Sequence, residues 1–354
     1  MKKKVLTGFF VLVLVSIGSI SCRSLSMDLT PTPLPATETW MSPTSTATQT
    51  PLPTMTNTVT ITFTPTVTNT PIPTATPLAT STIRESDGME MMYIYAGEFT
   101  MGITQETFDA LLEEKEKNGD YWSDQVIMSA MPQHAVYLDA YWIDKYEVNN
   151  TQFAAFLNAN GLQKFDGEWF FDQENNEYYL VQVGGLWTPK AGYEEVAVGG
   201  VGWHAARLYC EWVGARLPTE AEWERAARGT DARSYVWGEE DFKAGMAAFN
   251  DYPQIFYPGG SFEMDQSPYG VMDMTGNRRE WVNDWYYLKY YEASEYENPQ
   301  GHQQEYSEHG VKVQRGAGAY DFFPLFGTTY VRFANYPKVT YNQFGFRCAM
   351  DANP

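Results

Sequence analysis

The stretch Gly200–Gly229, GVGWHAARLYCEWVGARLPTEAEWERAARG, constrains the fold more than any other part of the chain, because it encodes two helices joined by a tight corner. The first half places apolar residues at the i, i+3, i+4, i+7 spacing of one helix face, namely Ala205, Leu208, Tyr209 and Trp212. Gly214 follows where a helix would end, since glycine adopts the left-handed backbone without steric cost.

The second half of this stretch carries its own start signal. Thr219 and Glu222 have the spacing of a capping box, in which the hydroxyl and the carboxylate each accept a hydrogen bond from a free amide of the first turn. The expected buried face is Trp223, Ala226 and Ala227. The sequence therefore predicts a helix, a corner and a second helix.

Length and charge limit the class of protein. The chain has 354 residues and a formal net charge of −20, enough for one large domain or two small ones. Nucleic-acid binding is excluded as a partner class, because it needs basic patches that displace phosphate counterions. An acidic surface suits cation binding, and it also suits a solvated coat on an exported protein.

The N-terminus predicts export. Residues 1–21 have a basic start and an apolar run typical of a secretory signal peptide. Cys22 follows at once and resembles the lipidated cysteine of a bacterial lipobox, so we expect 22–28 to be a lipid-bearing N-terminus. Cleavage and release without lipid is the alternative. Either way we expect an extracytoplasmic protein, at the cell envelope or surface, with no other membrane contact.

Thr, Pro, Ser and Ala dominate residues 29–88. Such a segment cannot bury enough apolar area to fold, so we predict a disordered, extended stalk. The same composition is typical of O-glycosylated stalks, which is a further hypothesis. The globular domain is predicted at 89–352.

Within that domain the signals are mixed. Apolar residues at every second position from Val136 to Trp142 predict one half-buried strand. Asn149 or Asn150 can cap a helix that follows it. Gly184-Gly185 predicts a hairpin. The stretch Thr104–Met131 reads as a surface excursion. Many aromatic residues with little regular periodicity predict a loop-rich α+β domain.

Two cysteines remain in the domain, Cys210 and Cys348. An even pair in an exported chain favours a disulfide, and two buried free thiols are the alternative.

The domain resembles the sulfatase-modifying factor family, the family of formylglycine-generating enzyme. The resemblance rests on GEFTMG, YLDAYWIDKYEVNN, the stretch Gly200–Gly229, MDMTGNRREWVNDWY, QRGAG and GFRCA, in that order. It implies a variant of the C-type-lectin fold. It also implies a long-range disulfide between Cys210 and Cys348.

Active members of that family oxidise a sulfatase cysteine to formylglycine with copper and oxygen. The resemblance implies a copper site of two thiolates, the soft ligands that copper(I) requires. The matching segment from Arg315 to Arg347 contains no cysteine, and Gly318 stands in place of the family's serine. We therefore expect no copper site and no catalytic residue here.

The resemblance also implies a calcium site. The matching positions are the side chain of Asp273, the backbone carbonyls of Gly276 and Arg278, and the side chain of Glu280. These are the hard oxygen ligands that calcium prefers. A tight turn in which Glu280 caps backbone amides is the alternative.

Two classes of function stay open. The first is a non-catalytic module that binds an extracellular or surface glycan, peptide or protein in an aromatic C-terminal groove. Its expected lining is Tyr320, Asp321, Phe322, Phe323, Phe326, Tyr330, Tyr336 and Tyr341. The second is an enzyme, either a formylglycine-generating oxidase or a divergent oxidoreductase of the same family. A purely structural protein of the cell envelope is a further alternative to these two classes.

Overall fold

The computed structural model describes residues 80–161, 164–165, 168–171, 179–249, 256–302 and 310–352. The predicted signal peptide, Cys22 and most of the predicted stalk lie outside the described residues and stay predictions. Within the described ranges, every helix is too short or too polar to cross a bilayer.

The folded domain begins before the predicted boundary at Met89, so the end of the predicted stalk is corrected. Strand β1 (Ser81–Ile83) pairs antiparallel with β2 (Glu90–Ile94). Arg84 is buried directly after β1, and its guanidinium donates to the Asp144 carboxylate at 2.6 Å. A three-residue edge strand is too short to give a periodic signal, which is why composition alone placed the boundary late.

Two four-stranded sheets frame the domain. One has the order β1-β2-β5-β14, with β5 at Tyr141–Asp144 and β14 at Ala349–Asp351. The other has the order β12-β11-β10-β13, with strands at Phe333–Asn335, Lys312–Arg315, Arg279–Trp285 and Phe344–Phe346. β13 and β14 follow each other in the chain but belong to different sheets, so the C-terminal segment joins the two.

Three two-stranded ribbons complete the strands of the ranges that the structure describes. They are β3 (Gly97–Met101) with β4 (His134–Leu138), β6 (Lys164–Phe165) with β7 (Glu168–Trp169), and β8 (Leu180–Val183) with β9 (Leu186–Pro189). The predicted hairpin is confirmed, because Gly184 and Gly185 connect β8 to β9 with φ of +60° and +86°. These positive angles explain the glycine pair.

The predicted helix pair is confirmed as α4 (Trp203–Trp212) and α5 (Glu220–Arg228). The capping box is present: Glu222 N donates to Thr219 Oγ1 at 3.2 Å, and Thr219 N donates to Glu222 Oε2 at 2.7 Å. The face of α5 is buried as expected. The face of α4 ends one turn early, because Trp212 is 38% exposed.

Helix α3 (Asn150–Asn160) begins as predicted. Its capping box joins Asn149 and Gln152, and it buries Phe153, Phe156 and Leu157. This apolar face packs with α4 in one core cluster, while a second cluster lies between α5 and the sheet of β2 and β5.

The single strand predicted from Val136 to Trp142 is wrong. The chain leaves β4 after Leu138 and enters β5 at Tyr141, in a different sheet. Side-chain parity changes at this break, so Tyr141 is 1% exposed and Trp142 is partly exposed. Apolar alternation that continues by chance across two strands cannot reveal such a break.

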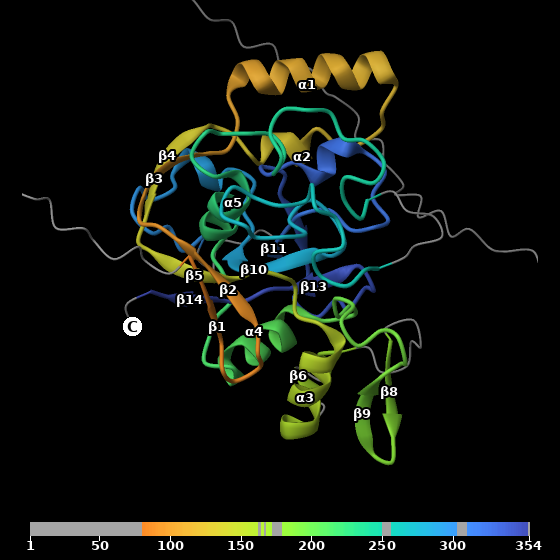
Figure 1. Ribbon diagram of the computed structural model, residues 1–354. Coiled ribbons are helices and arrows are strands. Elements are labelled where there is room, and N and C mark those ends of the chain that lie inside the picture. The colour runs from red at the N-terminus through yellow and green to blue at the C-terminus, as the bar shows by residue number, and fades with distance from the viewer. Residues whose placement is uncertain are drawn as a thin grey trace, which may run out of the picture. The chain divides into compact units, whose positions relative to one another are not determined.

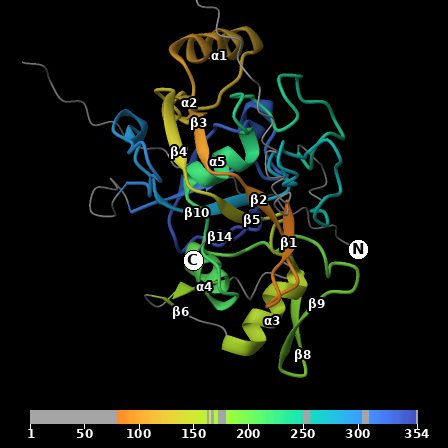
Figure 2. The ribbon, with the colours of Figure 1, turned by 60° about the vertical axis from the view of Figure 1, so that its left-hand side comes forward.

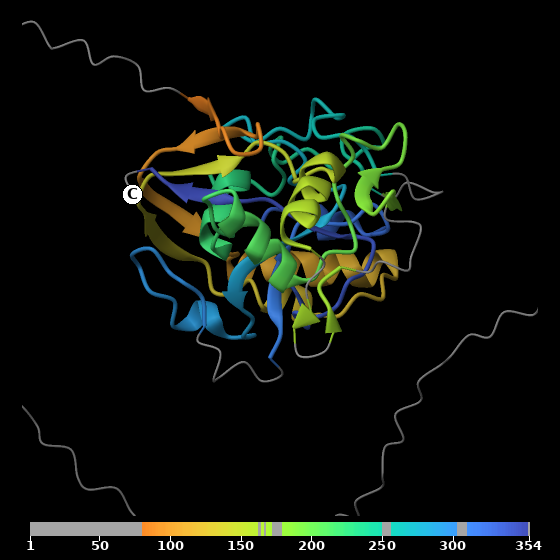
Figure 3. The ribbon, with the colours of Figure 1, turned by 90° about the horizontal axis from the view of Figure 1, so that it is seen from below.

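The stretch Thr104–Met131 is more than a surface excursion. It contains α1 (Gln105–Asn118) and α2 (Gln125–Met128), and it buries Trp122 and Ile127 against the C-terminal residues Leu325 and Val331. Figures 1 and 2 show α1 at one end of the domain, with α3 and the β8–β9 hairpin at the other. Figure 3 looks along this direction and places α3 and α4 in front of α1.

Among the described residues, the 3₁₀ helices η2 (Tyr290–Glu292) and η4 (Pro324–Gly327) lie in the long connections. Short strands, few helices and long connections make this the loop-rich α+β domain that the sequence predicts.

Candidate functional site

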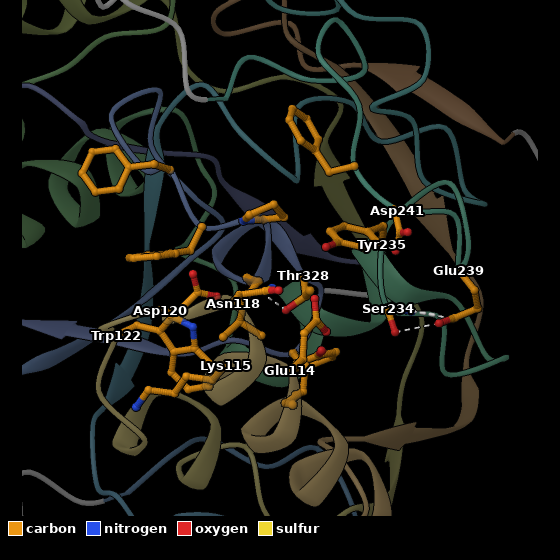
Figure 4. Close-up of a pocket in the computed structure, with 17 residues that line it drawn as sticks. Glu114, Lys115, Asn118, Asp120, Trp122, Ser234, Tyr235, Glu239, Asp241 and Thr328 are labelled. Carbon is orange, nitrogen blue, oxygen red and sulfur yellow. Dashed lines mark hydrogen bonds between the residues drawn. The ribbon is translucent and has the colours of Figure 1, made fainter.

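A cavity of about 470 Å³ lies between α1, the loop 234–242 and the C-terminal segment 322–330. We call it the α1 pocket, and Figure 4 shows the side chains that surround it. Its lining residues are Leu111, Glu114, Lys115, Asn118, Asp120, Trp122, Ser234, Tyr235, Glu239, Asp241, Phe242, Phe322, Phe323, Pro324, Leu325, Thr328 and Tyr330. Aromatic and carboxylate side chains therefore dominate this lining.

Helix α1 forms one wall, and both its ends are fixed locally. Thr104 caps the N-terminus, where its Oγ1 accepts a hydrogen bond from Thr107 N at 3.1 Å. Gly119 ends the helix with φ of +71°, a conformation that favours glycine. The chain can then turn and bury Trp122 at the base of the wall, with Asp120 beside the cavity.

The loop 234–242 forms the facing wall. Ser234 donates from its amide and its hydroxyl to the Glu239 carboxylate, both at 2.7 Å. Tyr235 stacks on Trp237 at 4.9 Å between ring centres. Thr329 N donates to Ser234 O at 2.8 Å, which ties this loop to the C-terminal segment.

The electrostatics of the cavity follow from its carboxylates. Burial raises the pKa of the Tyr330 phenol to about 12, and the charges of Glu239 and Glu114 add to the rise. Burial also raises the pKa of Tyr235, with Asp241, Glu114 and Glu239 among the charges that add to it. Carboxylates of both walls therefore act on the same two rings, which stay neutral phenols.

The eight residues of the predicted aromatic groove divide between the α1 pocket and other surroundings. Phe322, Phe323 and Tyr330 line the α1 pocket, while the other five predicted residues do not. Phe322 is 57% exposed and Tyr330 is buried. Three of the eight predicted residues therefore line the α1 pocket, and ligand binding by the predicted set stays a prediction.

The remaining five residues have other neighbours. Asp321 pairs with Arg279 at 2.5 Å, Tyr320 packs against Phe256, and Phe326 packs edge-on against Phe333. Tyr336 and Tyr341 are 50% and 61% exposed, and neither lines the pocket. Sequence order placed these residues together, but the segment from Tyr320 to Tyr341 gives most of them different neighbours; Phe326 still packs against Phe323 of the pocket.

Glu280, one of the four predicted calcium ligands, already has a partner. Arg347 Nη2 donates to Glu280 Oε1 at 2.6 Å, and Arg347 Nε donates to Oε2 at 2.7 Å. Trp223 Nε1 also donates to Oε2 at 3.0 Å. Both carboxylate oxygens of Glu280 are thus used inside the protein, and an ion at this loop would compete with Arg347.

The other predicted ligands lie beside a carboxylate that the sequence did not single out. Asp273 Oδ2 accepts from Gly260 N at 2.7 Å, and burial raises the pKa of Asp273 to about 6. Glu147 accepts from Arg278 N at 2.9 Å, and burial raises its pKa well above its usual range, with the charges of Glu280 and Asp273 adding. Glu147 lies just before Asn149 and Asn150, which the sequence predicts as candidate helix caps. Nothing in the sequence pattern marked Glu147 itself as part of a site.

The side chains of the predicted calcium site therefore have partners within the protein. Arg278 is fully buried, and its Nη2 donates to Ala197 O at 2.8 Å. Within the described ranges, no three or more His, Cys, Asp and Glu side chains are grouped to hold a metal ion. That finding does not cover a site that uses backbone carbonyls, such as those of Gly276 and Arg278, so calcium binding stays a prediction.

Cys210 and Cys348 are joined by a disulfide, as predicted, and both are fully buried. The third cysteine of the chain, Cys22, lies outside the described residues. The described domain thus contains no free thiol.

Comparison with known proteins identifies the domain type. Residues 77–352 match the model of the sulfatase-modifying factor enzyme 1-like domain. The formylglycine-generating enzyme of Bos taurus is 29% identical over 312 residues, covering 77% of this chain and 77% of the enzyme. The serine/threonine-protein kinase pkn1 of Chlamydia pneumoniae is 34% identical over 272 residues, or 75% of this chain.

The chain spans only 38% of the length of that kinase. Among solved structures, PvdO from Pseudomonas aeruginosa superposes with a TM-score of 0.57 and 23% identity, covering 77% of this chain and 98% of PvdO. This likeness bears on the fold alone, and it agrees with the predicted loop-rich, C-type-lectin-like architecture.

Proposed function

Because the chain belongs to the family of sulfatase-modifying factor enzyme 1-like domains, we propose that it uses the fold of that family as a non-catalytic ligand-binding module. The observation that carries the proposal is the α1 pocket. Its volume of about 470 Å³ lies within the range of small-molecule and side-chain binding sites, roughly 300–1,000 Å³. Aromatic rings and polar, mostly acidic, side chains line it, and aromatic surfaces give contact area at low entropic cost.

Thiol chemistry supports binding over oxidation. The segment Arg315–Arg347 has no cysteine, and the two cysteines of the described domain are held in one disulfide. Copper(I) is held by soft ligands such as thiolates, and a buried disulfide does not supply them. Relatedness to formylglycine-generating enzymes favours the alternative, an oxidase that acts on a sulfatase cysteine.

We propose that the module is displayed outside the cytoplasm. A lipid on Cys22 and the Thr/Pro-rich segment after it would anchor the domain and hold it away from the envelope. The partner would then be an extracellular or surface glycan, peptide or protein.

Arrays of glycans and peptides, probed with the purified full-length protein, test the proposal. Phe322→Ala removes an exposed ring that lines the pocket, and Tyr336→Ala removes a comparably exposed ring that does not. We expect the first variant to weaken binding of an array ligand about tenfold, the loss of one interfacial aromatic contact, and the second by less than about twofold. The proposal fails when no ligand binds, or when only Tyr336→Ala weakens binding.

A further inference from the structure

The charge around the α1 pocket is strongly unbalanced. Four carboxylates line it, those of Glu114, Asp120, Glu239 and Asp241. Lys115 is the one cationic side chain in the lining, and its Nζ pairs with Asp124 at 2.5 Å, outside the lining. The pocket therefore has an excess of negative charge that its own lysine does not neutralise.

The carboxylates of the lining form no ion pair in the part of the chain that the structure describes. Arg233 and Lys243 lie near enough for the charges of Glu239 and Asp241 to act on them, but they pair with Asp231 and Glu240 instead. Glu239 accepts hydrogen bonds from the amide and the hydroxyl of Ser234. Figure 4 shows Glu114 on the α1 side of the cavity, facing Tyr235 and Asp241 from the other wall. Like charges held around one cavity repel each other, so a cation placed between them would relieve this repulsion.

The aromatic side chains of the same walls already act as surfaces for cations. Lys115 Nζ lies 4.6 Å from the ring centre of Trp122. The Arg228 guanidinium lies 5.6 Å from the ring centre of Tyr330. Phe322, Phe323 and Tyr235 add further rings around the cavity. Rings and carboxylates around one space are the combination that recognises ammonium and guanidinium groups.

Other ligand chemistries fit less well. A phosphate, a sulfate ester or a carboxylate would meet four carboxylates of its own sign. A neutral glycan would stack on the rings but would leave the carboxylates without partners. The net charge of −20 adds a field that attracts cations to the whole surface.

We propose that the α1 pocket selects an organic cation, a guanidinium or alkylammonium group, held between the carboxylates of Glu114 and Asp241 and the aromatic walls. This inference rests on the proposed binding function and names the ligand class for that same pocket. The group could be carried by a peptide side chain or by a small molecule, and the chemistry that recognises it is the same.

Fluorescence anisotropy with labelled peptides tests the inference on the purified full-length protein. One neutral peptide scaffold carries a single arginine, and its matched control carries citrulline, which keeps the shape of the side chain and loses the charge. We expect the arginine peptide to bind about tenfold more tightly, as expected for one cation among carboxylates and rings. Unlabelled arginine amide then separates the two sources: it competes if a small cation suffices, and it does not if the peptide is required.

A pair of double variants separates the pocket from the general field. Glu114→Gln with Asp241→Asn removes two lining carboxylates, whereas Glu113→Gln with Glu240→Gln removes two exposed neighbours that do not line the pocket. The first double variant should bind the arginine peptide about tenfold more weakly and the citrulline peptide with unchanged affinity. The second double variant should change the affinity for each peptide by less than about twofold.

Four results overturn the inference. Equal binding of arginine and citrulline removes the role of charge, and equal losses in the two double variants assign the effect to the general field. A glycan that binds at the pocket while neither peptide binds also overturns it, but leaves the proposed function standing. Absence of any ligand at the pocket removes both.

Discussion

Two regions of this domain are rich in carboxylates and aromatic rings: the buried core around α5 and the α1 pocket. Among the described residues, carboxylates of the core form ion pairs with arginines, whereas those of the pocket do not. In the core, Glu220 and Glu224 are fully buried, and Arg315 donates to both, at 2.9 and 2.8 Å. Arg332 and Arg228 complete the pairing at 2.6 and 2.8 Å. In the pocket, Glu114 and Asp241 are exposed and form no ion pair within the described ranges.

The difference teaches how to separate structural charge from charge available to a ligand. A buried carboxylate must have its partner built in, because an unpaired ion in the interior costs several kcal/mol. A carboxylate at the rim of a cavity keeps its hydration and can exchange water for a ligand. The missing partner, rather than the carboxylate itself, marks the candidate site.

The largest expected effect comes from breaking the core. Glu220→Gln removes the carboxylate shared by Arg315 and Arg332 and leaves buried guanidinium groups with too few anions. We expect a loss of about 3–5 kcal/mol in the free energy of unfolding, measured by denaturant titration with the disulfide intact. Glu113→Gln on exposed α1 is the control and should change it by less than about 0.5 kcal/mol. A similar, small change in both variants would contradict the contrast between the regions.

Asp284 is an intermediate case, because it is buried in the core but forms no ion pair within the described ranges. Its Oδ2 accepts from Glu220 N at 2.8 Å. Burial raises the pKa of Asp284 to about 8, and the charge of Glu220 adds to the rise. The native state therefore holds a proton that the unfolded state has already released above about pH 4.

Because the native state keeps this proton, Asp284 lowers the free energy of unfolding as the pH rises from about 4 to about 8. The loss is at most about 1.4 kcal/mol per pH unit. Asp284→Asn can still accept the Glu220 amide and does not titrate. We expect the variant to gain stability over the parent as the pH rises through this window, followed by thermal or denaturant unfolding at several pH values. Parallel pH profiles for the two proteins would show that Asp284 is ionised in the native state.

The smallest effect sharpens the pocket side of the comparison. Lys115→Met removes the pocket's own cation while keeping a flexible apolar side chain beside Trp122. Affinity for the arginine peptide should rise about two- to threefold, because a repelling charge is lost, with a stability change below about 1 kcal/mol. Weaker binding in this variant would mean that Lys115 itself contacts the ligand.

The parts of the fold that could be predicted are those set by local chemistry. The capping boxes at Asn149 and Thr219, and the Gly184-Gly185 turn, depend on residues within a few positions of each other. The disulfide followed from family resemblance and cysteine count.

The parts that could not be predicted depend on contacts between distant segments. The α1 pocket brings together residues near 114, 235 and 323, and no local pattern in the acidic run of α1 shows what faces it. Arg347 and Glu280 form their pair across 67 positions of the chain, so the motif predicted a ligand where the structure has an ion pair. Sequence order likewise grouped eight aromatic-segment residues that the loop then separates.

The most direct test of the account is an oxidation assay. The purified full-length protein is incubated with copper, oxygen and a peptide that contains the Cys-x-Pro-x-Arg motif, and the peptide is followed by mass spectrometry. The account predicts that the cysteine is recovered without conversion, because the domain offers no free thiolate pair to copper. Formation of formylglycine at a rate similar to that of a formylglycine-generating enzyme run in parallel would contradict it.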